Sequence, residues 1–386
     1  MNADPFGKWW PCLRKHEKRL QVWVPHVRAL KARLNGRGLR YFTLCARPMI
    51  DVYLMVRENL VTQDPKTRRI DGVSFCESEP AVMAEMKELL GVEEAAFGAR
   101  LEDLVLFKDD ATTLPHATQE AIAEYIDQEG EKLTGNFIEA LELKRNHLEF
   151  HRLFPFDFLN LDFCDRYYPK PPDVLRIHQT VERLLDWQNE AGGTEGAKFR
   201  VDRFVVAITC RLDDALPPEA VERLKAIVAK NRDDHPEYAE ALGRLNGTTL
   251  DQWPVQDRLD FFMSAWPKEI ARLARDKAWD LKILDHVHYD RIGDNGNAYD
   301  MVCLVVEFTK TDICKTYLDA ARDALDAEAR RELMPVAEDT RKGKQLLASL
   351  RAVVALRNEQ AKHYKRDALP DPADELVRLR AEGVKI

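Results

Sequence analysis

Residues 282–309 read KILDHVHYDRIGDNGNAYDMVCLVVEFT, and this stretch decides the fold. The runs 282–289 and 299–309 are rich in β-branched, aromatic and other apolar residues, which is typical of strands. The connector between them, residues 290–298, is rich in Asp, Asn and Gly and is too short to hold a helix. Parallel neighbours need a crossover of about a dozen or more residues. The two strands are therefore predicted to be antiparallel.

Five further strands are predicted before this pair, and helical segments separate them. Each is a short apolar or aromatic run, and the runs lie at residues 40–45, 73–76, 104–107, 156–162 and 203–210. Strands that alternate with helices indicate βαβ units with a parallel sheet. The fold class is therefore predicted to be α/β, a doubly wound and mostly parallel seven-stranded sheet.

The chain is predicted to have one α/β domain with helical additions at both ends. A helical segment, residues 1–39, precedes the domain, which spans residues 40–310. Helical insertions are expected at residues 111–153 and 217–276. Residues 311–386 are charged and helical in pattern, with apolar stretches that favour packing on a protein partner.

Strand–helix units followed by an antiparallel hairpin resemble class I S-adenosylmethionine-dependent methyltransferases, over residues 40–309. The resemblance implies the strand order 3-2-1-4-5-7-6, with only the final hairpin antiparallel. It also implies S-adenosylmethionine as cofactor and a methyl acceptor that the sequence does not identify. In open α/β sheets ligands bind outside the carboxyl ends of the central strands, so the site is expected there.

The resemblance also implies roles for individual residues that follow the strands. Glu77, after the second strand, would bind the ribose hydroxyls, because a carboxylate can accept from two neighbouring hydroxyl groups. Asp109, after the third strand, would lie near the adenine amino group. Asp162, with Asn160 on the same strand face, would stand beside the transferred methyl group as the catalytic pair.

The loop after the first strand departs from the family, because residues 43–51 contain no glycine. Glycine there lets the backbone approach the methionine half of the cofactor. Thr43, Cys45 and Arg47 are the residues expected at that place. Arg47 could instead hold a carboxylate or phosphate at a helix start. The alternative function is a non-catalytic Rossmann-like module that binds a protein partner or a regulatory nucleotide, with Arg47 or Pro48 filling the methionine pocket.

No metal site is predicted. Four cysteines follow strand ends, but none belongs to a CxxC pair, and cysteine is often simply buried; they are Cys45, Cys76, Cys164 and Cys210. His286 and His288 share a strand face, which also suits a surface or cross-strand contact. Reduced thiols are expected, because the seven cysteines are widely spaced and odd in number.

The charge and the hydropathy of the chain indicate which classes of partner it binds. The chain has 58 Lys and Arg against 66 Asp and Glu, a net charge of -8, and both signs are scattered. A nucleic-acid partner is therefore possible, through the basic and Trp-containing residues 8–40, but it is not favoured. No apolar stretch reaches the roughly 18 residues of a membrane span, and the polar start lacks a signal-peptide core. The protein is expected to be cytoplasmic.

Overall fold

The computed structural model describes residues 19–34, 36–44, 49–64, 66–67, 69–91, 96–107, 135–189, 201–212, 216–234, 258–292 and 298–310. Its strands are β1 (Tyr41–Thr43), β2 (Thr62–Gln63), β3 (Ile70–Asp71), β4 (Val73–Cys76), β5 (Ala96–Phe97), β6 (Phe158–Arg166), β7 (Arg203–Arg211), β8 (Trp279–Ile292) and β9 (Ala298–Lys310). Seven of them form one sheet in the order β5-β4-β1-β6-β7-β9-β8, while β2 and β3 form a small separate pair.

The pairing directions confirm the predicted order and the predicted hairpin. The strands β5, β4, β1, β6 and β7 are adjacent in this order and run parallel to one another. β9 is antiparallel both to β7 and to β8. β9 therefore lies between β7 and the edge strand β8. The antiparallel pairing of β8 and β9 is the arrangement predicted from their short connector.

The prediction of a third strand at residues 104–107 is wrong. Residues Leu101–Val105 form the short helix α5, and the third strand is the two-residue β5, which pairs with the end of β4. A four-residue apolar run does not by itself distinguish a strand from a buried helical turn. Leu101, Leu104 and Val105 are all buried at the spacing of a helical face, which explains the outcome.

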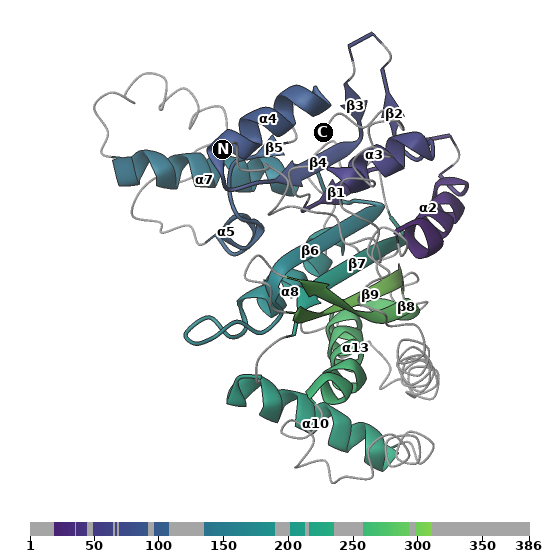
Figure 1. Cartoon of the computed structure of the whole chain (residues 1–386), viewed down its shortest axis with the longest axis vertical. Helices are drawn as coiled ribbons and strands as arrows, with labels where there is room; N and C mark the ends of the chain where they lie inside the picture. Colours follow the sequence, from purple (N-terminus) through teal and green to yellow (C-terminus); the bar gives the residue numbers. More distant parts are fainter. Residues whose placement is uncertain are drawn as a thin grey trace, which may run out of the picture.

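Helices cover both faces of the sheet (Figure 1). One face packs against α5 and four longer helices, α7 (Gly135–Arg152), α8 (Arg176–Asn189), α10 (Pro218–Asp234) and α13 (Arg258–Asp276). The other packs against a π-helical turn η1 (Arg19–Trp23) and three helices, α2 (Val24–Lys31), α3 (Ile50–Arg57) and α4 (Pro80–Leu90). Alternate residues of each strand point to opposite faces, so Phe42 and Leu159 join the first core and Tyr41 and Phe158 the second.

Several other predictions meet the structure only in part. The antiparallel pair β2 and β3 lies in a polar and charged segment for which the sequence predicted no strand. Of the two insertions, residues 111–134 and 235–257 lie outside the described residues, as do residues 1–18 and the C-terminal segment 311–386 with its expected partner surface. Among the described helices, none is long and apolar enough to cross a membrane.

Candidate functional site

A buried hydrogen-bond network joins the carboxyl end of β1 and the neighbouring residue Asn160 of β6 to the start of α3. The hydroxyl groups of Tyr41 and Thr43 each donate to Oδ2 of Asp51, at 2.6 Å. Nδ2 of Asn160 donates to Thr43 Oγ1 at 3.0 Å and to Asp51 Oδ2 at 3.1 Å. Thr43 and Asn160 are register partners in parallel strands, which places their side chains together on one face.

Asp51 is the centre of this network, and it is ionised. Burial opposes the charge of a carboxylate, but the positive charge of Arg19 and three hydrogen bonds outweigh that effect and hold the pKa of Asp51 below its ordinary value. Sequence reasoning missed this residue. Its signal was an acid inside the otherwise apolar helical run from Ile50 to Met55, which a solvated face would not place there.

Asp162 lies two residues beyond Asn160 on the same face and is 8% exposed. The guanidinium Nη2 of Arg19, from η1, lies 4.0 Å from Asp162 Oδ2, and the Arg19 guanidinium also lies 5.4 Å from the ring centre of Trp23. The turn η1 therefore lies against the middle of β6. The structure brings together three of the predicted residues, because Asn160 bonds to Thr43 and lies two residues from Asp162 on the same strand face.

Three buried polar atoms around Asp162 have no hydrogen-bond partner among the described residues. They are Oδ1 of Asn160, Oγ1 of Thr209 and Nε of Arg19. Thr209 is the register partner of Asp162 on β7. Buried polar groups are nearly always satisfied in folded proteins. This end of the sheet therefore has hydrogen-bonding capacity that its own side chains do not use.

Glu77 follows β4 directly and is half-buried. Its Oε1 accepts a 2.8 Å hydrogen bond from the backbone N–H of Glu79, where α4 begins, and its own N–H donates to the carbonyl of Phe97. Since β1 lies between β4 and β6, Glu77 stands two strands from Asn160, roughly 10 Å away at the usual strand spacing. Glu77 is thus at the predicted edge but outside the buried network.

The remaining predicted cofactor residues, Cys45, Arg47 and Asp109, lie outside the described residues. The described chain resumes at Met49, whose φ of 46° is left-handed, and it enters α3 at the next residue. This conformation costs a non-glycine residue roughly 1–2 kcal/mol. Such strain gathers at ligand sites when the surrounding structure enforces it, and here it lies two residues before Asp51.

A second buried polar cluster lies on the opposite face of the sheet, centred on the fully buried Glu269 of α13. Arg223 Nε donates to Glu269 Oε1, and Arg272 donates to both carboxylate oxygens at 3.0 Å. His178 Nε2 accepts from Arg223 Nη2 at 2.9 Å. Burial lowers the pKa of His178 to about 4, so its imidazole is neutral near neutral pH. The cluster ties α8, α10 and α13 together.

The described cysteines and histidines take separate places. Cys76, Cys210 and Cys303 are buried free thiols, and burial raises the pKa of the first two well above the ordinary thiol value. No three potential metal ligands gather among the residues that the structure describes. His288 Nε2 contacts Asp300 Oδ1 of the neighbouring strand at 2.7 Å, which agrees with a cross-strand role. His286 is fully buried beside Trp266.

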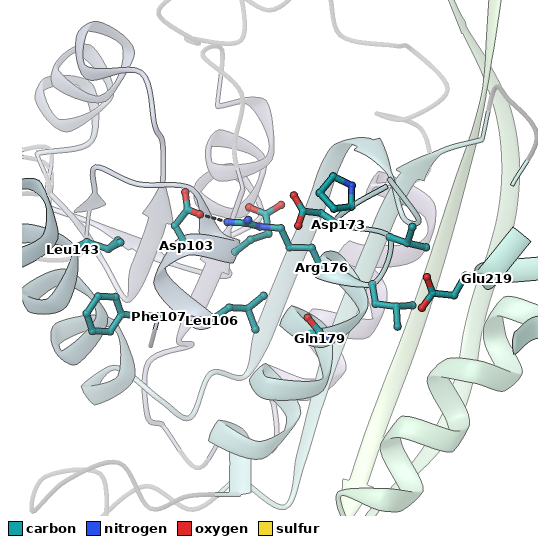
Figure 2. A pocket seen from close by; sticks show the side chains of 12 residues that line it. Asp103, Leu106, Phe107, Leu143, Asp173, Arg176, Gln179 and Glu219 are labelled. Atoms are coloured by element: carbon teal, nitrogen blue, oxygen red, sulfur yellow. Dashed lines mark hydrogen bonds and ion pairs between the residues drawn. The ribbon is translucent and has the colours of Figure 1, made fainter. Parts of the chain in front are cut away.

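A cavity of about 750 Å³ opens between α5, α7, α8 and α10 (Figure 2). We call it the acidic cavity, since four carboxylates and one arginine line it within the part of the chain that the structure describes. The lining residues of that part are Glu102, Asp103, Leu106, Phe107, Leu143, Pro172, Asp173, Val174, Leu175, Arg176, Gln179 and Glu219. Arg176 pairs with Asp103 across the opening. The sequence did not predict this cavity, because residues 104–107 were predicted to form a strand, whereas Leu101–Val105 form α5.

Comparison with known proteins returned no family model and no curated protein that matches the chain. Its function is therefore argued from the fold and from the geometry of these sites.

Proposed function

We propose that this chain is an S-adenosylmethionine-dependent methyltransferase whose cofactor binds at the carboxyl ends of β4 and β1, beside residues 160–162 of β6. The observation that carries the proposal is the strand order, with β9 inserted antiparallel between β7 and β8. Two acids lie on either side of β1 in this order: Glu77 directly follows β4, and Asp162 lies in the middle of β6. Crevices at this position are the usual ligand sites of open α/β sheets.

The polar groups at this edge of the sheet fit the proposed cofactor. Glu77 uses one carboxylate oxygen for the start of α4, and its Oε2 has no hydrogen bond within the described part of the chain, so it can accept from a ribose hydroxyl. The unused Oδ1 of Asn160 and Oγ1 of Thr209 supply further polar capacity beside Asp162. Arg19 is the counter-argument, because its guanidinium already lies 4.0 Å from the Asp162 carboxylate.

In the proposed methyl transfer, the residues of this site would have different roles. S-adenosylmethionine, when bound, supplies an electrophilic methyl group. Glu77 would hold and orient the ribose, while Asp162 would orient the acceptor and take up its proton where the acceptor must lose one. Arg19 and Trp23 would keep water from Asp162, since both side chains are buried against the first half of β6.

A non-catalytic module that binds a regulatory nucleotide is the second candidate. The observation that favours it is the burial of Asp162 and Asn160 beneath η1, with Asn160 Nδ2 committed to Thr43 and Asp51. In this function the edge of the sheet binds a ligand without transferring a group. Both functions predict a nucleoside site near Glu77, and only the first predicts a methylated product.

Calorimetric titration of the full chain with S-adenosylmethionine tests the proposal. We expect saturable binding that Glu77→Ala weakens by about tenfold or more, because a charge-assisted hydrogen bond is lost. Glu79→Ala is the matched control: it removes the same charge two residues away, from an exposed side chain that makes no capping hydrogen bond. Absence of binding to the wild-type chain at millimolar cofactor would overturn the proposal.

A second experiment separates the two candidates. The purified chain is incubated with cell extract and S-adenosylmethionine labelled in its methyl group. The methyltransferase predicts labelled product that depends on the chain and declines in Asp162→Asn. Binding in the titration without any chain-dependent label would favour the non-catalytic module.

A further inference from the structure

The acidic cavity lies at the starts of three helices, each of which follows a parallel strand of the sheet. Glu102 is the second residue of α5, Arg176 the first of α8 and Glu219 the second of α10, and these helices follow β5, β6 and β7. The cavity thus opens at the carboxyl edge of the sheet, on the face opposite to the Asp51 network. Its volume of about 750 Å³ is within the range of small-molecule sites.

The charges of the lining favour a cation. Among the described lining residues, four carboxylates face one guanidinium, and that guanidinium, of Arg176, is already paired with Asp103. The N-termini of α8 and α10 oppose this field, but each is equivalent to only roughly half a positive charge. The carboxylates of Glu102, Asp173 and Glu219 therefore leave an excess of negative charge in the cavity.

Glu102 is an independent sign of a missing ligand. Its side chain is only 9% exposed, and its recorded ionic contact, Arg100 Nε, lies 3.8 Å away, beyond hydrogen-bond distance. No hydrogen bond to this carboxylate is present within the described residues. Complementing a helix start would explain an exposed acid, but α5 has only five residues and does not require an acid whose side chain is 9% exposed. Besides its long contact with Arg100, this carboxylate therefore has room to accept hydrogen bonds from a cation in the cavity.

The rest of the lining describes the body of the ligand. Figure 2 shows Phe107 and Leu143 on one side of Arg176, Leu106 and Gln179 below it and Glu219 on the far side. Val174 and Leu175 extend the apolar wall. Apolar walls with a few charged groups bind a ligand whose body is apolar and whose charge is local.

We propose that the acidic cavity binds an organic amine in its ammonium form, with an aromatic or alkyl body against Phe107, Leu143 and Val174 and the ammonium group at Glu102. Asp173 and Glu219 add to the field that attracts the cation, and Gln179 offers an amide to a further polar group. This site is independent of the proposed cofactor site and stands whether or not S-adenosylmethionine binds.

Tryptamine is a suitable probe, because it joins an aromatic ring to an ammonium group, and indole-3-ethanol carries the same ring without charge. We expect the full chain to bind tryptamine in calorimetric titration at least about tenfold more tightly than indole-3-ethanol. Glu102→Gln should weaken tryptamine binding by about tenfold and leave indole-3-ethanol binding unchanged. Glu222→Gln is the control: it makes the same change on α10 at a residue that is 75% exposed and does not line the cavity.

A second variant keeps the test decisive if Glu102→Gln fails to fold. Asp173 is exposed and lines the cavity, so Asp173→Asn should fold normally and weaken tryptamine by about threefold. Equal affinity for the two probes, no tryptamine binding at millimolar concentration, or unchanged binding in a folded Glu102→Gln variant would each overturn the inference. Titration of the same variants with S-adenosylmethionine should show no change, which separates this site from the proposed cofactor site.

Discussion

The hydroxyl group of Thr43 donates a 2.6 Å hydrogen bond to the buried carboxylate of Asp51. The bond ties the last residue of β1 to the first turn of α3, so both sides of the predicted glycine-free loop meet at one charged group. In families with a glycine-rich loop this crossing depends on backbone freedom. Here a carboxylate with three donors sets the geometry.

Replacing Asp51 with asparagine should lower the free energy of unfolding by about 2–4 kcal/mol, because two hydroxyl groups and an amide lose an ionised acceptor inside the core. Chemical denaturation monitored by circular dichroism measures the change. Asp71→Asn is the control, since the Asp71 side chain is 66% exposed, and it should change stability by less than about 0.5 kcal/mol. Similar effects for the two variants would contradict the role of the network.

The same carboxylate predicts acid sensitivity. The pKa of Asp51 is lower in the folded chain than its ordinary value of 3.8, so the stability it contributes is present above that value and is lost as the pH falls below it. Unfolding curves at successively lower pH should show a smaller acid dependence in Asp51→Asn than in the wild-type chain. An identical acid dependence in both would exclude an ionised Asp51.

His286 is predicted to destabilise the fold. Both of its ring nitrogens are buried without a hydrogen-bond partner among the described residues. His286→Leu, a change of similar volume, should therefore raise the free energy of unfolding by about 1–2 kcal/mol near neutral pH. His288→Leu is the matched control on the same strand, and it should destabilise, because His288 is bonded to Asp300. Loss of stability in both variants would contradict this account.

His286 should also make the fold pH-dependent. Burial lowers its pKa to about 3 from 6.5, so the unfolded chain binds a proton at this imidazole more readily than the folded chain does. The free energy of unfolding therefore falls as the pH falls from 6.5 toward 3. The wild-type chain should lose about 2 kcal/mol more than His286→Leu between about pH 7 and about pH 5. Urea denaturation at the two pH values measures this difference. His178, whose pKa burial lowers to about 4, keeps its own dependence in both chains.

Glu269 should be essential to the helices of the first face. Glu269→Gln leaves Arg223 and Arg272 without their buried counter-charge, so we expect a loss of about 3 kcal/mol in the free energy of unfolding. Asp276→Asn, on the same helix, removes an ion pair of Arg272 at 3.9 Å whose carboxylate is 41% exposed. That control should change stability by less than about 1 kcal/mol.

Gly72 should not accept a side chain. Its φ is +77°, and a Cβ atom there would lie 2.3 Å from the carbonyl oxygen of Leu39. Gly36 has a similar φ of +84° but open space around it. Gly36→Ala should therefore show only the backbone cost of about 1 kcal/mol, and Gly72→Ala should lose at least about 2 kcal/mol in thermal denaturation. Equal losses would exclude the contact with Leu39 as a cause.

The sequence predicted the sheet well because its signals are local. The run 73–76 became β4 with the same bounds, and the continuous apolar run 203–210 became a strand covered on both faces. The hairpin followed from the length of one connector. The run 104–107 misled the prediction, because four apolar residues fit a helical turn as well as a strand.

The buried clusters were not predictable in the same way. Glu269 lies 46 residues from Arg223 and 91 from His178, and no local pattern links them before the chain folds. The sequence placed Asn160 and Asp162 on one strand face, but their neighbours Asp51 and Arg19 come from other helical segments. The sequence predicts which residues share a strand face, whereas the side chains that contact them depend on which other segments pack on that face.

The place of β9 also has a consequence for synthesis. Within the described sheet β8 pairs only with β9, and β7 pairs on that side only with β9. When β8 has been synthesised, the strand with which it pairs has not yet been made. The edge of β7 also stays unpaired for nearly a hundred residues, until β9 is complete. The nascent chain depends on its latest described strand to close the sheet, and exposed edges of this kind are where newborn chains associate wrongly.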